Sequence, residues 1–205
     1  MSYKIIVARY NENIEWFNSE LSNCIIYNKG QKLGIENEIL LKNVGRESET
    51  YLHYIITNYH NLPDVVVFTQ ARISDHKGRD DVNYLINIKN QALNYSKSSN
   101  FKIHYDSGRN IYFDKEWNLR KDGWYLKNNY KNNEPVTFFE WFKTNINVDY
   151  PNPLYFYHNA IFAVNKSIII NKPIEYYKKL IQEVNHHINS TEGHFFERSW
   201  YYIFY

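Results

Sequence analysis

The sequence predicts an α/β fold with a largely parallel central sheet flanked by helices and a small antiparallel element toward the C-terminus. In the first hundred residues, short runs rich in Val and Ile alternate with segments of helical periodicity, as in βαβ units. The run Val65–Phe68 is continuously apolar, which is typical of a strand buried on both faces in the middle of a sheet. Polar residues and glycines follow the ends of these runs, where loops are expected.

Each element has its own local signal. Leu52, Ile55, Ile56 and Tyr59 repeat at helical spacing, so a helix should begin near Glu47. Residues 104–136 have no sustained period and predict a long functional loop region. The predicted strands are residues 5–8, 24–27, 39–41, 65–68 and one or two within 155–164. The other predicted helices are one built on Ile14, Phe17 and Leu21, then residues 82–95, 138–142, 173–187 and 191 to the end.

Length and composition narrow the class of protein. A chain of 205 residues suits a single domain spanning 1–205, and 43% apolar residues suffice for a packed core. Lys and Arg number 24 against 22 Asp and Glu, so the chain lacks the broad positive field of a nucleic-acid-binding protein. No apolar run approaches the roughly 18 residues of a membrane span. The lone Cys24 lies in an apolar run and predicts a buried, inert thiol in a cytoplasmic, reducing setting.

Four polar clusters follow the predicted strands. Because the carboxyl ends of parallel strands share one edge of a sheet, these clusters should converge on one crevice. The alternative is that each cluster is an ordinary solvated loop. The clusters are Arg9, Tyr10 and Asn11; Asn28 and Lys29; Asn43, Gly45 and Arg46; and Gln70, Arg72, Asp75 and His76.

The residue types in this crevice suit a nucleotide diphosphate. An aromatic ring can stack on a base, and guanidinium groups near a helix N-terminus attract phosphate. Gly45 permits a tight turn before the helix, and Arg46 follows at the position where the helix dipole already favours anions. Alternatively, Arg46 only pairs with Glu49 or Glu12.

Asp75 and His76 are candidate metal ligands. A carboxylate and an imidazole near a diphosphate could hold Mg²⁺ or Mn²⁺, since one carboxylate plus phosphate oxygens can suffice. The structural alternative is that Asp75 caps a turn with Ser74 and His76 faces water.

Glu192 and Glu197 are the candidate general bases. Both lie in the last predicted helix, and either could accept the proton of a hydroxyl if it faces the crevice. The structural alternative is an ion pair between Glu197 and Arg198, with Trp200 as a core anchor.

With these residues in view, the chain resembles a family of small glycosyltransferases that includes the N-terminal glycosyltransferase domain of a chlorella-virus glycan-synthesis protein. The matching segments span nearly the whole chain in the same order. They are Val7–Glu12, Ile26–Gly30, Asn43–Glu47 with Thr50–His53, Leu62–Val65, Phe68-x-Gln70 with Asp75-His76, and Glu197-Arg198-x-Trp200 with Ile203-Phe204.

This resemblance implies a GT-A fold, whose central sheet is of the Rossmann type, a UDP-sugar donor, a glycan acceptor and a bridging Mn²⁺ or Mg²⁺. Residues 1–100 would bind the nucleotide sugar and residues 101–205 the acceptor. The aromatic residues of 104–136, Trp124 among them, would form the acceptor face with His158 and Asn159, unless they serve only packing. A viral origin would place the product on a capsid glycan made in the host cytosol.

One family motif departs from the expected pattern. A GT-A enzyme normally carries Asp-x-Asp at the end of the central strand, whereas this chain reads Gln70-Ala71-Arg72. Either Asp75 takes over the metal, or Arg72 supplies part of its charge. The missing motif makes an inert nucleotide-sugar or carbohydrate binding module a rival function. A second, separate rival is a metal-dependent hydrolase using His76, His104 and His158.

Overall fold

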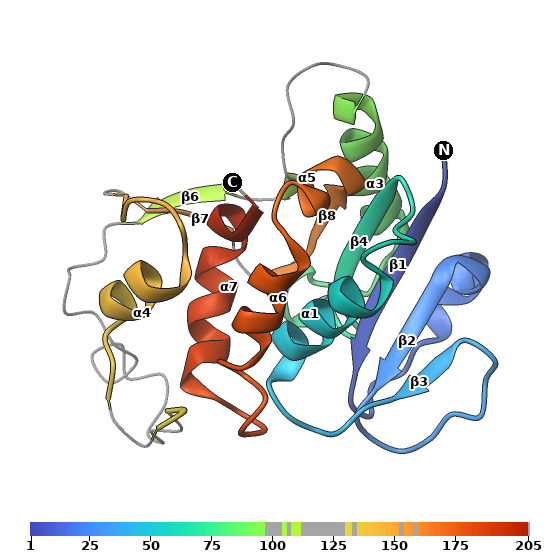
Figure 1. Cartoon of the computed structure of the whole chain (residues 1–205). Helices are drawn as coiled ribbons and strands as arrows, with labels where there is room; N and C mark the ends of the chain where they lie inside the picture. The colour runs from blue at the N-terminus through green and yellow to red at the C-terminus, as the bar shows by residue number, and fades with distance from the viewer. Residues whose placement is uncertain are drawn as a thin grey trace.

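A six-stranded sheet organises the computed structural model, in the order β3-β2-β1-β4-β8-β5 (Figure 1). The structure describes residues 1–96, 104–105, 108–111, 130–132, 135–151, 154–157 and 160–204. The strands of this sheet are β1 (Tyr3–Arg9), β2 (Cys24–Asn28), β3 (Glu38–Leu40), β4 (Val65–Gln70), β5 (His104–Tyr105) and β8 (Phe162–Asn165).

The sheet is parallel through its first four strands and mixed beyond them. Strands β3, β2, β1 and β4 pair in parallel, β8 pairs antiparallel with β4, and β5 pairs antiparallel with β8. A separate antiparallel pair joins β6 (Gly108–Ile111) to β7 (Leu154–Tyr157). The prediction of a largely parallel sheet with a small antiparallel element toward the C-terminus is therefore confirmed.

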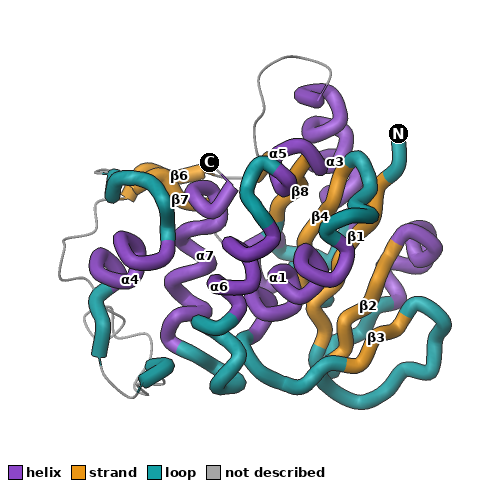
Figure 2. The backbone as a smooth tube through the Cα atoms, in the orientation of Figure 1, coloured by secondary structure: helices purple, strands orange, loops and turns teal. Residues whose placement is uncertain are grey.

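Helices cover both faces of the sheet. In Figure 1, α1 lies in front of the central strands, α6 lies beside α1, and α3 lies behind the strands; Figure 2 shows the same arrangement around β1 and β4. The helices are the 3₁₀ helix η1 (Glu15–Asn23), α1 (Arg46–Asn58), α2 (Ser74–Lys77), α3 (Val82–Ser96), α4 (Phe138–Asn145), α5 (Lys166–Ile170), α6 (Ile174–Ile181) and α7 (Thr191–Phe204).

Two apolar cores lie on opposite faces of the sheet because successive strand residues point to opposite sides. Ile6 and Phe68 join the core beneath α1 and α7, while Ile5 and Val67 join the core beneath η1 and α3. All four side chains are fully buried, and for Val67 and Phe68 this confirms the prediction of a central strand buried on both faces. Trp200 of α7 is 1% exposed, which confirms it as a core anchor.

The second half of the chain differs from the prediction in detail. The expected loop 104–136 contains the short strands β5 and β6, which are too brief to produce a period in the sequence. The helix expected over 173–187 ends at Ile181 and is followed by a series of turns. The short helices α2 and α5 were not predicted.

The structure can be compared with the sequence predictions for Cys24 and for membrane-spanning helices. Cys24 is 1% exposed, so the predicted burial of its thiol is confirmed, and that burial raises the pKa of the thiol to about 12. In the part of the chain that the structure describes, no helix combines the length and apolar character needed to cross a bilayer.

The turn before α1 depends on glycine. Gly45 has φ of +61°, and a Cβ there would lie 2.5 Å from the carbonyl oxygen of Val184 and 2.6 Å from Glu49 Cβ. We expect Gly45→Ala to lower the free energy of unfolding by clearly more than the about 1–2 kcal/mol of left-handed strain alone. Gly34→Ala is the matched control, because Gly34 has φ of +76° and nothing within 4 Å of a new Cβ. Urea unfolding measures both, and equal losses would show that the contact with Val184 is unimportant.

Candidate functional site

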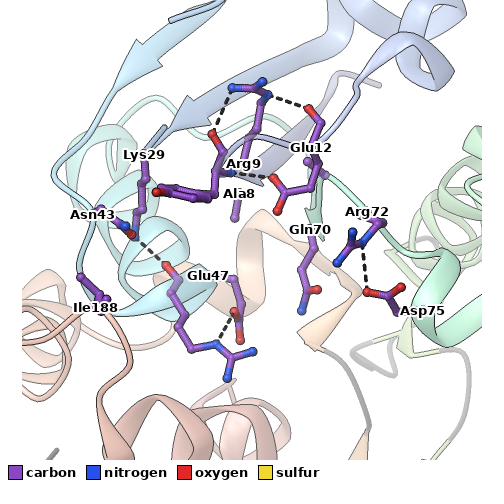
Figure 3. A pocket seen from close by; sticks show the side chains of 13 residues that line it. Ala8, Arg9, Glu12, Lys29, Asn43, Glu47, Gln70, Arg72, Asp75 and Ile188 are labelled. Carbon is purple, nitrogen blue, oxygen red and sulfur yellow. Dashed lines mark hydrogen bonds and ion pairs between the residues drawn. The ribbon is translucent and has the colours of Figure 1, made fainter. Parts of the chain in front are cut away.

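A cavity of about 370 Å³ lies beyond the carboxyl ends of β1 and β4 (Figure 3). β1 pairs with β2 on one side and with β4 on the other, so the chain reverses its direction of travel across the sheet at this point. Ligands of open α/β sheets bind in the crevice at such a switch point. The cavity is therefore in the position where the sheet topology favours a binding site.

Seven of the predicted site residues line this cavity, although they come from three separate clusters. The remaining cluster, Asn28 and Lys29, contributes Lys29. Asn11 and Asn28 are not among the described lining residues. Their side chains form hydrogen bonds within the loops that follow β1 and β2. The seven are Arg9, Tyr10, Asn43, Arg46, Gln70, Arg72 and Asp75.

Arg9 locks together the loops that follow β1 and β2. Its Nε donates to the carbonyl of Glu12 at 2.9 Å, and its Nη1 donates to Asn28 Oδ1 at 2.8 Å and to the carbonyl of Gln31 at 3.0 Å. The residue is only 7% exposed. Arg9 therefore organises the wall of the cavity through bonds that already occupy much of its guanidinium group.

The two loops touch without a side chain between them at Gly30. A Cβ at this position would lie 1.7 Å from the carbonyl oxygen of Tyr10, so only glycine fits. Asn11 Oδ1 accepts the N–H of Gln31 at 2.8 Å across the same contact. This close approach sets the position of Tyr10, a residue that lines the cavity and is 51% exposed.

Lys29 fixes the turn that begins α1. Its ammonium donates to the carbonyls of Val44 and Arg46, both at 2.6 Å, and pairs with Glu49 at 2.7 Å. Gly45 and Arg46 both have positive φ, of 61° and 51°. Burial lowers the pKa of Lys29, and the neighbouring Glu49 carboxylate opposes that shift by favouring the ammonium. Three donors thus meet three acceptors, as a buried ammonium requires.

Arg46 enters the cavity between two partners. Its Nε lies 3.5 Å from Glu47 Oε2, and its Nη1 lies 3.2 and 3.4 Å from the two ring nitrogens of His194. His194 is 3% exposed. Its burial, together with the guanidinium groups of Arg46 and Arg198, lowers the pKa of the ring to about 3, so the imidazole is neutral at ordinary pH. Neither Glu49 nor Glu12, the partners considered from the sequence, forms a described pair with Arg46.

The end of β4 supplies the opposite side of the cavity. Arg72 Nε donates to Asp75 Oδ2 at 3.0 Å, and both side chains are more than half exposed. The N–H of Ser74 donates to Asp80 rather than to Asp75, so the expected turn cap belongs to Asp80. In the view of Figure 3, Gln70 extends between Glu47 on one side and the Arg72–Asp75 pair on the other.

The donor set limits the kind of metal site the cavity can form. Among the described residues, no group of three His, Cys, Asp or Glu side chains is arranged to hold an ion. Glu12, Glu47 and Asp75 line the cavity, and Mg²⁺ or Mn²⁺ can bind through one or two carboxylates plus phosphate oxygens. The residues present therefore fit an ion shared with a phosphate ligand. The side chain of His76 lies outside what the structure describes.

Glu192 and Glu197, the two candidate general bases, are not among the residues that line this cavity. Glu192 lines a second cavity, of about 430 Å³, together with Trp141 and Glu183. It is 2% exposed, its Oε1 accepts the N–H of Lys131 at 2.8 Å, and burial raises its pKa. Glu197 pairs with Arg198 at 3.5 Å, as its structural interpretation predicted.

The acceptor candidates Trp124, His158 and Asn159 lie outside the described residues. Conversely, Glu12, Glu47, Ile188 and His194 belong to the site or support it but were not predicted. Glu12 and Glu47 adjoin predicted clusters, which is a signal that could have identified them. Ile188 and His194 carry no such signal, because only the folded chain brings them near the strand ends.

The fold and the cavity together define an α/β protein with a candidate binding site at the switch point of its sheet. A family of proteins described as of unknown function (DUF3431) matches residues 5–205. The chain belongs to this family. No curated protein and no solved structure matches the chain.

The neutral state of His194 predicts how stability responds to acid. An unfolded His194 would take up a proton below about pH 6.5, whereas the folded ring, with a pKa of about 3, does not. Stability contributed by the neutral ring is therefore present above pH 6.5 and falls as the pH is lowered toward 3. Between pH 7 and 5, wild type should lose up to about 2 kcal/mol of unfolding free energy that His194→Gln does not lose.

Urea unfolding at the two pH values measures this difference. His60→Gln is the control, because His60 is exposed, and it should keep the pH dependence of wild type. A His194→Gln variant with an unchanged pH dependence would contradict the neutral assignment.

Proposed function

We propose that this protein is a glycosyltransferase of the GT-A kind that moves a sugar from a UDP-sugar to a hydroxyl of a glycan acceptor. The observation that carries the proposal is the meeting of Arg46 and Arg72 with the exposed Tyr10 ring in one cavity at the switch point of the sheet. The proposal also draws on the resemblance of segments across the chain to small glycosyltransferases. It places the reaction in the cytoplasm, which would be the host cytosol if the chain is viral.

The chemistry of the cavity suits a nucleoside diphosphate. Guanidinium groups bind phosphate through paired, charge-assisted hydrogen bonds, and both Arg46, the first residue of α1, and Arg72, in the loop after β4, line the cavity. Tyr10 offers an aromatic face for a base, and the amides of Asn43 and Gln70 can bind base edges or sugar hydroxyls. The volume of about 370 Å³ falls within the range of small-molecule sites.

In the proposed reaction, an acceptor hydroxyl attacks the anomeric carbon of the donor. A bond forms between the acceptor oxygen and that carbon, and the bond from the carbon to the phosphate oxygen breaks. Arg46 and Arg72 stabilise the charge that develops on the departing UDP. The acceptor proton passes to a carboxylate if the configuration inverts, or to the leaving phosphate if it is retained. Glu12, Glu47 and Asp75 are the described carboxylates of the cavity that could accept it.

A divalent ion, when bound, would neutralise part of the charge of the diphosphate. Asp75 is the residue we propose to hold it, because its carboxylate is exposed at the cavity wall. Asp75 is paired with Arg72, so binding an ion would free the Arg72 guanidinium for a phosphate oxygen. The two roles considered for the missing Asp-x-Asp motif are thus linked through one ion pair.

Ligand binding tests the proposal first. UDP should raise the thermal unfolding midpoint, since a ligand held only by the native state stabilises it. Arg46→Ala should weaken UDP binding by roughly 10- to 100-fold, the loss expected for a hydrogen bond to a charged group. Arg79→Ala is the matched control, because Arg79 is exposed, pairs with Asp81 and does not line the cavity. Equal effects of the two arginine variants would argue against the proposed phosphate site.

The ion requirement is tested by titrating UDP with and without Mn²⁺. We expect Arg72→Ala to weaken binding about tenfold without the ion, since it removes a phosphate donor. We expect Asp75→Asn to abolish the further gain in affinity that Mn²⁺ produces in wild type. If Asp75→Asn keeps the full response to Mn²⁺, the ion is held elsewhere.

An inert binding module is the alternative function, and the missing Asp-x-Asp motif favours it. The two functions differ in turnover. A transferase should slowly hydrolyse its UDP-sugar in the presence of Mn²⁺ or pass the sugar to a glycan, and an inert module should bind the donor and do neither. Release of UDP, measured over a panel of UDP-sugars, distinguishes them.

A further inference from the structure

His194 joins the C-terminal helix to the candidate site. It lies in the first turn of α7, 148 positions from Arg46 in the sequence, and is 3% exposed. Its Nε2 lies 3.2 Å from Asn189 Oδ1, which can only accept a hydrogen bond. The contact with Asn189 places the ring hydrogen on Nε2. Nδ1 is then the acceptor for Arg46 Nη1, which lies 3.4 Å from Nδ1 and 3.2 Å from Nε2.

The surroundings of His194 keep the ring in this accepting form. The Arg198 guanidinium donates to the backbone carbonyl of His194 at 2.9 Å, and the charges of Arg198 and Arg46 both lower the pKa of the ring. A protonated imidazole has no lone pair to offer Arg46 and would repel both guanidinium groups. The His194 ring is therefore a neutral hydrogen-bond acceptor in the neighbourhood of two guanidinium groups, those of Arg46 and Arg198.

Arg46 is held at three points. Lys29 donates to its backbone carbonyl at 2.6 Å, Glu47 Oε2 lies 3.5 Å from its Nε, and the accepting Nδ1 of His194 lies 3.4 Å from its Nη1. An arginine side chain carries about 2 kcal/mol of rotamer entropy, which binding a ligand would otherwise reduce. A side chain already fixed in direction binds its ligand more tightly because that entropy is lost beforehand.

We propose that His194 is a positioning residue of this site, whose neutral ring holds the Arg46 guanidinium in the orientation that grips the phosphates of the ligand. This inference rests on the proposed function, because it takes a nucleoside diphosphate as the ligand. It makes the first turn of α7 part of the donor site, although His194 itself does not line the described cavity.

A double-mutant cycle on UDP affinity tests the role. His194→Ala should weaken UDP binding about 5- to 30-fold, and Arg46→Ala should weaken it more. In the double variant, the loss should equal that of Arg46→Ala alone, because a residue that acts through Arg46 has no effect once Arg46 is gone. His194→Gln, which keeps a neutral acceptor, should recover most of the wild-type affinity. Calorimetric titration with UDP provides each dissociation constant.

Two further variants separate positioning from folding. Ser199→Ala is the matched control, since the buried Ser199 hydroxyl donates to the carbonyl of Phe195 within α7 at 2.8 Å, and the change should leave UDP affinity unchanged. His194→Phe keeps a ring of similar size without the acceptor. It should lose affinity as His194→Ala does, and it replaces that variant if His194→Ala does not fold.

The possible outcomes distinguish the two proposals. If the losses of Arg46→Ala and His194→Ala are additive, or if His194→Phe binds UDP as wild type does, the positioning role is wrong while UDP binding stands. If wild type binds neither UDP nor any UDP-sugar, the proposed function fails and the role of His194 fails with it.

Discussion

The buried ammonium of Lys29 is the contact on which the candidate site depends. It satisfies the carbonyls of a turn in which two successive residues have positive φ, and it neutralises Glu49 in the first turn of α1. A buried charge is expensive unless it is fully paired, and here three acceptors surround three donors. Removing Lys29 would leave a buried carboxylate and two carbonyls without their donor, in a turn that is already strained.

This contact links neighbouring strands to the helix that follows them. Lys29 comes directly after β2, and its backbone N–H donates to the carbonyl of Arg9 at the end of β1 at 2.8 Å. Its side chain reaches the start of α1. The ends of two parallel strands and the start of a helix are therefore fixed relative to one another, and Arg46 is presented to the cavity from a turn that the sheet itself determines.

The sequence predicted the parts of this arrangement that depend on local pattern. The apolar run Val65–Phe68 marks β4, and the polar residues after each strand mark the cavity, because parallel strands end at a common edge. The pattern could not distinguish a side chain that faces the cavity from one that braces a loop. Asn28 is 1% exposed and bonds to Arg9, although its position in the sequence is equivalent to that of residues that line the cavity.

Contacts between segments far apart in the chain could not be predicted from the sequence. His194 was one residue of an aromatic, helical stretch, and nothing in that stretch relates it to Arg46. Glu192 illustrates the same limit, because it was a predicted site residue that the structure places outside the site. Its place in the first turn of the last helix allowed an orientation toward the strand ends, but the side chain lines a second cavity with Trp141 and Glu183. Helical spacing gives the relative directions of neighbouring side chains, and the packing of the whole helix decides which direction faces the site.

The replacement of Asp-x-Asp by Gln70-Ala71-Arg72 changes the balance of charge at the end of β4. A pair of aspartates would repel a diphosphate unless an ion lay between them, whereas Arg72 attracts it directly. Asp75 then has two uses: it neutralises Arg72 in the absence of ligand, at 3.0 Å, and it becomes available to an ion once a phosphate has taken its partner. Because both side chains are more than half exposed, this exchange requires little desolvation and no movement of the core. In the proposed enzyme, affinity for the ion therefore arises mainly after the nucleotide has bound, and guanidinium groups supply the initial attraction.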